Sequence, residues 1–256
     1  MPDRLKGKVV WITGASSGIG EALAIQCSRE GARVILSSRR ASELERVRKQ
    51  CSGEATILPF DLVDVDQIAD ATSKAGLVDI LIHSGGVSQR SLAKDTDLQT
   101  DRAIMDIDYF GTVALTKAVL PSMLARGSGH IVAISSVLGY VGTPLRSAYA
   151  AAKHALHGFF DSLRAEVEKD GVSVTIVCPG YVRTNVSINA FTGDGSAYGK
   201  TDMTHQKAIR AEDAAPRIVD GIVKKKHEVI VGGKETLAIP LKRFVPSLLA
   251  RMVRMK

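Results

Sequence analysis

The sequence predicts an α/β protein with a doubly wound parallel sheet of about seven strands and helices on both faces. Short apolar runs alternate with longer segments of helical spacing, which is typical of parallel sheets. Several runs end in polar or glycine-rich tips, where ligands bind in such sheets. The sequence shows neither an internal repeat nor a proline-rich linker, so we expect one domain over residues 1–256. The expected strands are at 8–12, 32–37, 55–60, 78–82, 129–134, 172–178 and 228–231.

The bulk composition is that of an ordinary globular chain with an excess of positive charge. The 256 residues are 45% apolar, and the formal net charge is +7. A basic balance suits an anionic phosphorylated cofactor, and no nucleic-acid motif accompanies it. No apolar run approaches the roughly 18 residues of a membrane span, and the start lacks a signal-peptide core. We therefore expect a cytoplasmic protein that binds no nucleic acid.

The three cysteines, Cys27, Cys51 and Cys178, show no metal-like spacing. An odd number of cysteines without such spacing favours buried or spare thiols in a reducing compartment. We therefore predict no metal site from the sequence.

A glycine-rich turn, Thr-Gly-Ala-Ser-Ser-Gly-Ile-Gly at residues 13–20, follows the first expected strand. A helical pattern continues from it, so the N–H groups and positive dipole end of that helix would face the turn. Glycine also lets the backbone approach a pyrophosphate closely. The turn predicts a dinucleotide site, with a plain structural turn as the alternative.

The second expected strand ends in Ser38-Arg39-Arg40, without an acidic residue at its tip. A sheet that prefers NAD carries an acid here, whereas arginine accommodates the 2′-phosphate of NADP. Arg39 could bind that phosphate through two N–H groups. We therefore predict NADP(H) as the cofactor; the alternative is a solvated start of the charged helix expected at 41–51.

Two further strand tips carry polar residues. Asp61 could contact an adenine amino group, or it could cap the helix expected from Asp64. The fourth strand is followed by His83-Ser84-Gly85-Gly86, whose glycines would let the backbone pass close to a cofactor. His83 could take part in proton chemistry, but we favour a structural imidazole.

The middle of the chain brings two serines, a tyrosine and a lysine into one pattern. The strand at 129–134 ends at Ser135-Ser136, and Tyr149 and Lys153 share one face of an alanine-rich helix. A phenol near a fixed ammonium has its ionised form stabilised. Tyr149 is therefore a candidate proton donor and acceptor tuned by Lys153, and Ser136 a candidate hydroxyl for a carbonyl oxygen.

A long helix is expected over residues 100–124, and it carries Asp106 and Asp108. Together with the helix that starts near residue 147, it could supply an oligomer face.

The C-terminal part adds a long loop and a basic tail. Residues 186–205 have few apolar anchors, and loops of this length are usually functional or mobile. We predict a substrate lid there, with a plain surface loop as the alternative. After a helix at 212–225, residues 237–256 form a basic amphipathic segment that could contact a membrane surface or a partner, or pack on its own domain.

Six motifs occur in order: residues 13–20, Asp61-Leu62, the glycine pair after the fourth strand, Ser136, Tyr149-x-x-x-Lys153 and Pro179-Gly180-x-x-x-Thr184. Through them the chain resembles the short-chain dehydrogenase/reductase family of the classical type over nearly its whole length. The arginine-bearing tip and basic tail resemble most the subgroup around 11β-hydroxysteroid dehydrogenase and its orphan dehydrogenase relatives. The resemblance implies a Rossmann fold, and we expect a homodimer or homotetramer.

The resemblance also implies roles for individual residues. Ser136 lies thirteen residues before the tyrosine, which is the family spacing, and Tyr149 would exchange a proton with the substrate oxygen. Lys153 would assist Tyr149 and hold the nicotinamide ribose. The expected cofactor residues are Gly14, Ser16, Ser17, Gly18, Ile19, Arg39, Arg40, Asp61, Leu62, Gly85, Tyr149, Lys153, Val182 and Thr184.

Two departures from the family pattern concern the site. The family's Asn-Asn-Ala-Gly is here His83-Ser84-Gly85-Gly86. The helical asparagine that helps to seat a water beside the lysine is here Asp108, which we include among the catalytic candidates. Aspartate keeps the backbone carbonyl and adds a negative charge near Lys153. We expect the proton relay to survive with an altered pH dependence.

The sequence as a whole predicts an NADP(H)-dependent oxidoreductase that interconverts a carbonyl and an alcohol on a lipophilic small molecule. One alternative is a homologue that binds the dinucleotide but has lost the chemistry. The other is a membrane-surface or scaffold protein that uses the tail.

Overall fold

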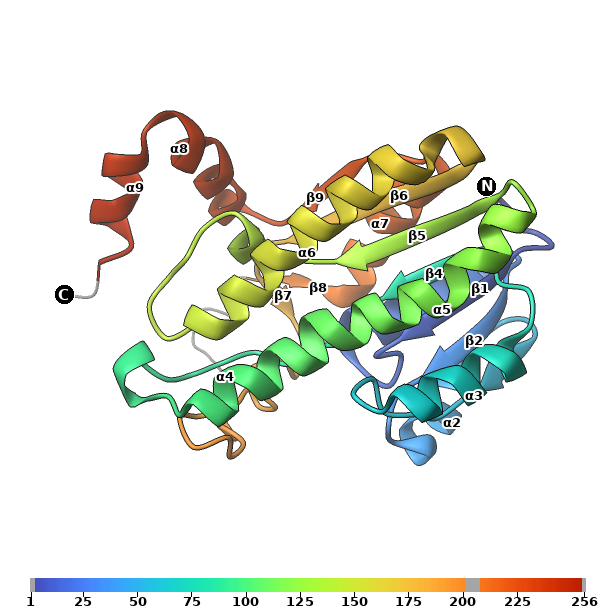
Figure 1. Ribbon diagram of the computed structural model, residues 1–256, viewed down its shortest axis with the longest axis horizontal. Coiled ribbons are helices and arrows are strands. Elements are labelled where there is room, and N and C mark those ends of the chain that lie inside the picture. Colours follow the sequence, from blue (N-terminus) through green and yellow to red (C-terminus); the bar gives the residue numbers. More distant parts are fainter. Residues whose placement is uncertain (1–2, 201–207, 255–256) are drawn as a thin grey trace.

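Parallel strands form the central sheet of the computed structural model, which describes residues 3–200 and 208–254 (Figure 1). The strands are β1 (Val9–Thr13), β2 (Arg33–Ser37), β3 (Ala55–Ile57), β4 (Ile80–His83), β5 (Gly129–Ile134), β6 (Val172–Pro179) and β9 (Glu228–Val231). Their order is β3-β2-β1-β4-β5-β6-β9, and every neighbouring pair is parallel. The predicted doubly wound sheet of about seven strands is confirmed. A separate pair, β7 (Val182–Arg183) and β8 (Ile209–Arg210), forms a small second sheet.

Helices cover both faces of the sheet. They are α1 (Gly18–Arg29), α2 (Ala41–Arg48), α3 (Val65–Ala75), α5 (Gly111–Ala125), α6 (Ser147–Val167) and α7 (Ala211–Val223). A further helix, α4 (Leu98–Met105), packs against α6 beyond the sheet. In β1, Val10 and Ile12 pack into the core with α1, α2 and α7, whereas Val9 and Trp11 pack with α3, α5 and α6. The second group of helices lies in front of the sheet in Figure 1. The inner strands β1, β2, β4, β5 and β6 are buried on both sides because helices cover both faces there, whereas the edge strand β9 alternates exposed and buried residues.

The winding of the chain reverses between β1 and β4. Thr13 at the end of β1 is the ladder neighbour of Ser37 in β2 and of His83 in β4. The carboxyl ends of these strands therefore meet at one edge of the sheet. Ligands of open α/β sheets bind at this reversal point.

The helix expected over 100–124 is interrupted. A π-helical turn, Asp106–Phe110, joins α4 to α5 and contains the buried Asp108. Such single-turn bulges are frequent at functional sites. Helical periodicity did not indicate this turn, because a change of one residue in the repeat is too local to be read from the apolar pattern.

The tail, expected as a basic amphipathic segment, is folded into short helices. A 3-10 turn at Lys234–Leu237 leads into α8 (Ala238–Phe244), and α9 (Pro246–Met252) follows. Pro246 disfavours a helical conformation at Val245, whose φ and ψ are −138° and 59°. The two helices project from one end of the molecule in Figure 1. Among the described residues, no helix has the length and apolar character needed to cross a membrane.

Further 3-10 turns lie at Ala93–Asp95, Val137–Gly139 and Glu168–Asp170. Residues 201–205 of the expected lid and 255–256 of the tail lie outside the described residues.

Candidate active site

A cavity of about 1150 Å³ lies along the carboxyl edge of the sheet. Its wall runs from Thr13 in β1 to Val253 in the tail. The sequence-predicted site residues that line it are Gly14, Ser16, Ser17, Ile19, Arg39, Arg40, Asp61, Leu62, Gly85, Ser136, Tyr149, Lys153, Val182 and Thr184. Of the remaining two, Gly18 begins α1 and Asp108 lies behind Lys153. The structure thus brings residues from nearly every predicted strand tip into one cavity.

The glycine turn between β1 and α1 has no room for a side chain at its glycines. Gly14 has φ of +64°, and a Cβ there would lie 2.5 Å from the carbonyl oxygen of Ser84. Gly18 has φ of +60°, and its Cβ would lie 3.0 Å from Thr184 Cγ2. Ser17 caps α1 with extended backbone, so the first N–H groups of the helix begin at the turn. The turn fits a bound pyrophosphate, because it combines bare backbone with a helix N-terminus.

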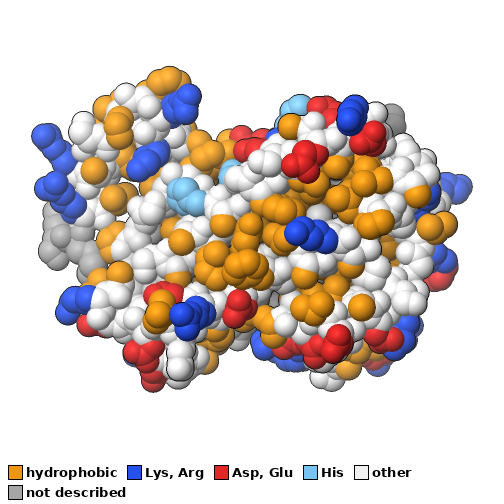
Figure 2. Space-filling view, in the orientation of Figure 1, with side chains coloured by type: hydrophobic (Ala, Val, Ile, Leu, Met, Phe, Trp, Pro, Cys, Tyr) orange, Lys and Arg blue, Asp and Glu red, His pale blue; other side chains and the backbone are white. Residues whose placement is uncertain are grey.

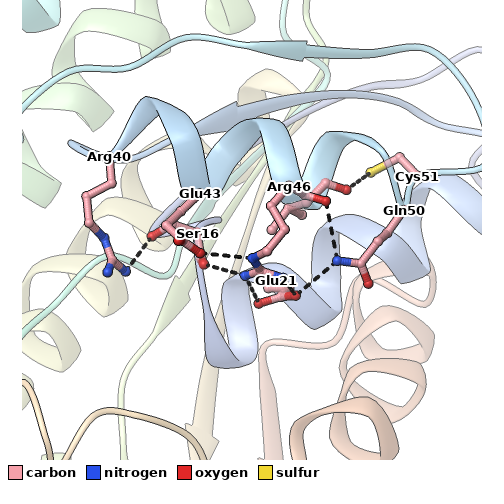
Figure 3. A network of polar contacts seen from close by, with 8 residues as sticks. Ser16, Glu21, Arg40, Glu43, Arg46, Gln50 and Cys51 are labelled. Carbon is pink, nitrogen blue, oxygen red and sulfur yellow. Dashed lines mark hydrogen bonds and ion pairs between the residues drawn. The ribbon is translucent and has the colours of Figure 1, made fainter.

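The tip of β2 presents two arginines to the same cavity. The Arg39 side chain is 72% exposed, and its Nη1 lies 3.9 Å from Asp61 Oδ2. Arg40 Nη2 lies 3.5 Å from Ser16 Oγ, so this side chain reaches back to the glycine turn (Figure 3). The two guanidinium groups therefore lie at the end of the cavity next to the glycine turn.

Arg46 is a supporting residue that the sequence analysis missed. Its Nη2 donates to the carbonyl oxygen of Ser16 at 3.1 Å, and its Nη1 pairs with Glu21 Oε1 at 2.7 Å (Figure 3). These two contacts connect α2 to the glycine turn and to α1. The alternating charges of residues 41–51 predict a solvated helix face, and nothing in their spacing distinguishes Arg46 from its neighbours.

Asp61 does not cap α3. Asp64 does so instead, by accepting from the N–H of Gln67 at 3.0 Å. Asp61 Oδ1 accepts from the N–H of Val63 at 3.2 Å, and its side chain lines the cavity. Of the two interpretations offered for Asp61, the helix cap is therefore wrong.

The serine, tyrosine and lysine line the same cavity. Lys153 Nζ is 5.4 Å from the centroid of the Tyr149 ring and 3.3 Å from the carbonyl oxygen of Ile134, at the end of β5. Ser136 Oγ accepts from the N–H of Leu138 at 3.1 Å, which leaves its hydroxyl hydrogen for another acceptor. Ser135 is used differently, because its Oγ contacts His157 Nε2 at 2.9 Å and the carbonyl oxygen of Lys153 at 3.4 Å.

Asp108 contacts Lys153 directly. Its Oδ2 lies 3.1 Å from Lys153 Nζ, and its Oδ1 accepts from the N–H of Val87 at 2.7 Å. Burial raises the pKa of Asp108, although the Lys153 charge and the Val87 hydrogen bond oppose that rise. Burial alone would lower the pKa of Lys153, but the charges of Asp108 and Tyr149 outweigh it and the pKa is raised. The ammonium of Lys153 is thus held in its charged form beside Tyr149.

His83 is a structural residue. Its ring is buried, and its Nε2 lies 2.8 Å from Thr116 Oγ1 on α5. Burial lowers the pKa of His83 to about 3, so the imidazole is neutral at working pH. His83 does not line the cavity, which agrees with the favoured interpretation of the sequence.

Gln89 is a second residue that the sequence analysis missed. Its buried Oε1 accepts from the N–H of Ala148 at 2.8 Å, in the first turn of α6. Its Nε2 lies within 3.3 Å of the hydroxyls of Ser91, Thr96 and Ser147. Gln89 therefore fixes the start of the helix that carries Tyr149. No local pattern marks it, because its partner is 59 residues away.

The described part of the expected lid is anchored by backbone hydrogen bonds. The N–H of Phe191 donates to Ser88 O at 2.8 Å, and the N–H of Arg90 donates to Phe191 O at 2.8 Å. The N–H of Asp97 donates to Gly193 O at 2.9 Å. Phe191 also lines the cavity, as do apolar side chains of the tail such as Leu241 and Leu249. The lid segment and the tail thus both contribute to the wall.

Comparison with known proteins places this geometry in a family. The sequence model described as short chain dehydrogenase matches residues 8–194. A dehydrogenase/reductase SDR family protein 7-like of Drosophila melanogaster is 46% identical over 96% of this chain and 79% of its own. Dehydrogenase/reductase SDR family member 7B of Mus musculus is 41% identical over 97% and 81%. A solved short-chain dehydrogenase from Streptomyces avermitilis has a TM-score of 0.81 and 30% identity, with coverage of 96% and 95%. The chain therefore belongs to the short-chain dehydrogenase family, whose members are oxidoreductases that bind a nicotinamide dinucleotide and act on small molecules.

Proposed function

We propose that the protein is an NADP(H)-dependent oxidoreductase that interconverts a carbonyl and an alcohol on a lipophilic small molecule. The observation that carries this proposal is the position of Tyr149, Lys153 and Ser136 on the wall of the cavity that the glycine turn also lines. A proton donor and a phosphate-binding turn in one cavity allow substrate and dinucleotide to meet. The continuous wall from Thr13 to Val253 supports a single catalytic domain.

The residues of the glycine turn and of the β2 tip would hold the dinucleotide. Gly14 and Gly18 leave the backbone bare at the N-terminus of α1, which suits a pyrophosphate. Arg39 and Arg40 would pair with a 2′-phosphate, and no acidic residue occupies the end of β2 to repel it. When bound, the nicotinamide supplies or accepts the hydride.

The side chains of this chain would manage the proton. Ser136 would donate its hydroxyl hydrogen to the substrate oxygen, and Tyr149 would give a proton to that oxygen or take one from it. Lys153, held by Asp108 and by the carbonyl of Ile134, would stabilise the phenolate form of Tyr149. General acid–base assistance of this kind contributes roughly 10²–10⁴-fold to the rate.

The substitution Tyr149→Phe tests the proposal. It is expected to lower turnover of carbonyl substrates by roughly 10²–10⁴-fold while NADPH binding, measured by fluorescence, is retained. Tyr109→Phe is the matched control, because it removes a hydroxyl from a tyrosine that does not line the cavity. Unchanged turnover in Tyr149→Phe would refute the role. If the wild-type protein binds NADPH but oxidises it with none of the carbonyl compounds in a broad panel, the non-catalytic alternative would be supported instead.

The substitution Arg39→Ala tests the cofactor preference. Losing a hydrogen bond to a charged group is expected to weaken NADPH binding about 10- to 100-fold and to leave NADH nearly unaffected. Arg33→Ala, at the other end of β2, is the matched control. Parallel losses for both dinucleotides would contradict the assignment.

The substrate class follows from the apolar residues of the cavity wall. Val87, Leu138, Val141 and Phe191 line the cavity together with Leu249 of the tail. An apolar wall with a few polar groups at the reacting end is typical of a site for a lipophilic carbonyl compound. We propose that the segment 186–205 acts as a substrate lid over it.

The tail also supports peripheral contact with a membrane surface. Phe244 is 79% exposed and Met252 is 64% exposed, and Lys242, Arg243 and Arg251 lie among them. Exposed apolar side chains beside cations favour an anionic lipid surface. Sedimentation with anionic liposomes is expected for the whole chain and not after removal of residues 237–256; equal sedimentation would dispose of the idea.

A second surface supports self-association. Figure 2 shows hydrophobic side chains gathered over the region of α5 and α6. Tyr109 packs against both the 56% exposed Phe110 and Phe159 there. Extended apolar patches of this kind mark protein–protein contacts, and we propose a homodimer or homotetramer that uses this face. Phe110→Glu is expected to lower the mass measured by light scattering; an unchanged mass would contradict it.

A further inference from the structure

A cluster of metal-ligating side chains lies outside the cavity wall. His157 of α6, Cys178 of β6 and Glu228 of β9 each offer one ligand atom, and these atoms all lie within 4.8 Å of one another. His157 and Cys178 are buried, whereas Glu228 is exposed at the start of its strand. None of the three has a role in the proposed redox reaction. The sequence concealed the cluster, because its members are 21 and 50 residues apart along the chain.

The two distances from the cysteine sulfur to the other ligand atoms are close to those of a tetrahedral centre. Cys178 Sγ lies 3.8 Å from His157 Nε2 and 3.5 Å from Glu228 Oε1. Zinc bonds of about 2.3 Å to sulfur and about 2.0–2.2 Å to nitrogen or oxygen place such atoms about 3.6 Å apart. A small inward rotation of side chains would therefore suffice to bring the three donors to bonding distance.

The surroundings hold the donors in place. The Tyr140 hydroxyl donates to Glu228 Oε1, and the Tyr140 ring packs edge-on against His157 with centroids 4.4 Å apart. His157 follows Lys153 by one helical turn on the long helix α6, so its position is fixed by the same packing as the catalytic face. Ligands on rigid elements with oriented partners are typical of a preformed metal site.

We propose that His157, Cys178 and Glu228 form a binding site for a divalent transition-metal ion of the zinc class, with solvent in the fourth position. One sulfur, one nitrogen and one oxygen donor suit Zn²⁺, and they do not suit Mg²⁺ or Ca²⁺, which need oxygen ligands. On binding, the Cys178 thiol loses its proton to solvent and a metal–sulfur bond forms, without any change of oxidation state. Glu228, as the exposed member, gives the ion a route from the surface.

Metal binding would affect the active site by changing the contacts of Ser135. His157 Nε2 now contacts Ser135 Oγ at 2.9 Å, and an ion on Nε2 would replace that contact. Ser135 precedes Ser136 and also contacts the carbonyl of Lys153. We therefore expect Zn²⁺ to alter turnover, although the site itself does not depend on the proposed redox function.

A direct test uses Co²⁺ as a spectroscopic substitute for Zn²⁺ on the purified whole chain without a histidine tag. One ion per chain is expected, with a thiolate-to-cobalt absorption band in the near ultraviolet that Zn²⁺ abolishes by displacement. Cys178→Ser is expected to lose the band, and Cys51→Ser, the matched control at a half-buried cysteine, is expected to keep it. Absence of the band, or its survival in Cys178→Ser, would overturn the proposal.

A second variant keeps the proposal testable if Cys178→Ser fails to fold. Glu228→Gln alters an exposed side chain, and it is expected to weaken Zn²⁺ binding by at least the roughly 10- to 100-fold that loss of a ligand's supporting partner costs. Glu54→Gln serves as its control, because Glu54 is also exposed and precedes β3, at the opposite edge of the sheet from β9. Equal Zn²⁺ affinity in wild type and Glu228→Gln would exclude the three-ligand site.

Discussion

Replacement of Asp108 should have a large effect on stability, because it breaks an ion pair that is wholly buried. Asp108 is 0% exposed, and its Oδ2 lies 3.1 Å from Lys153 Nζ. At an effective dielectric constant of about 20, two unit charges at this distance attract by about 5 kcal/mol. Removing one partner of a buried pair costs about 3–5 kcal/mol, because the other charge is left without compensation. We therefore expect Asp108→Ala to lower the free energy of unfolding by about 3–5 kcal/mol.

The assay is equilibrium unfolding in denaturant together with calorimetry at neutral pH. For a chain of this size, the expected loss corresponds to a fall in Tm of about 6–20 °C. Asp106→Ala, in the same π-helical turn but exposed, is the matched control and should be nearly neutral. A loss of less than about 1 kcal/mol in the free energy of unfolding of Asp108→Ala would refute the reasoning, because the charge of Lys153 would then be compensated without Asp108.

The same contact sets the expected pH dependence. Asp108→Asn keeps an acceptor for the N–H of Val87 but removes the charge that holds the pKa of Lys153 up against burial. The pKa of Lys153 should fall, so the ammonium is lost at lower pH than in the wild type. The alkaline limb of the pH–rate profile should therefore move towards neutral pH. An unmoved profile would contradict the proposed part of Asp108 in the relay.

Two further substitutions test the supports of the site. Gly14→Ala should lower the free energy of unfolding by about 2–5 kcal/mol and weaken dinucleotide binding, because alanine is strained at φ +64° and its Cβ would meet Ser84. Gly142→Ala, with open space around it, is the control. Equal melting temperatures of the two variants would contradict this view. Gln89→Leu should lower the free energy of unfolding by about 1–3 kcal/mol and reduce kcat, because it loosens the start of α6. Gln50→Leu, at an exposed position, should do neither. An unaltered kcat with a lowered Tm in Gln89→Leu would show that Gln89 has a purely structural role.

Much of the fold was predictable because the inner strands are buried on both faces. Their apolar runs stand out, and the expected strand at 129–134 agrees with β5 residue for residue. The cavity residues were also predictable, because function at a parallel sheet is concentrated at strand ends that are adjacent in sequence to those runs. Tyr149 and Lys153 share a helix face through a local spacing that can be read directly.

The remaining features depend on contacts between distant parts of the chain. Gln89 acts on Ala148, Arg46 acts on Ser16, and the cluster at Cys178 joins three separate elements. No local pattern encodes such pairs. The break at Pro246 is different, because proline disfavours helix at the preceding residue, and a closer reading of that single position would have divided the tail.

The tail has a consequence for how substrate preference should be measured. Leu241, Leu249 and Met252 from α8 and α9 form part of the cavity wall, although these helices project from the body of the molecule. Removal of α8 and α9 would take these apolar side chains out of the wall and expose the cavity to water. Truncated protein should therefore accept smaller and more polar compounds than the whole chain, and its selectivity would misrepresent the enzyme.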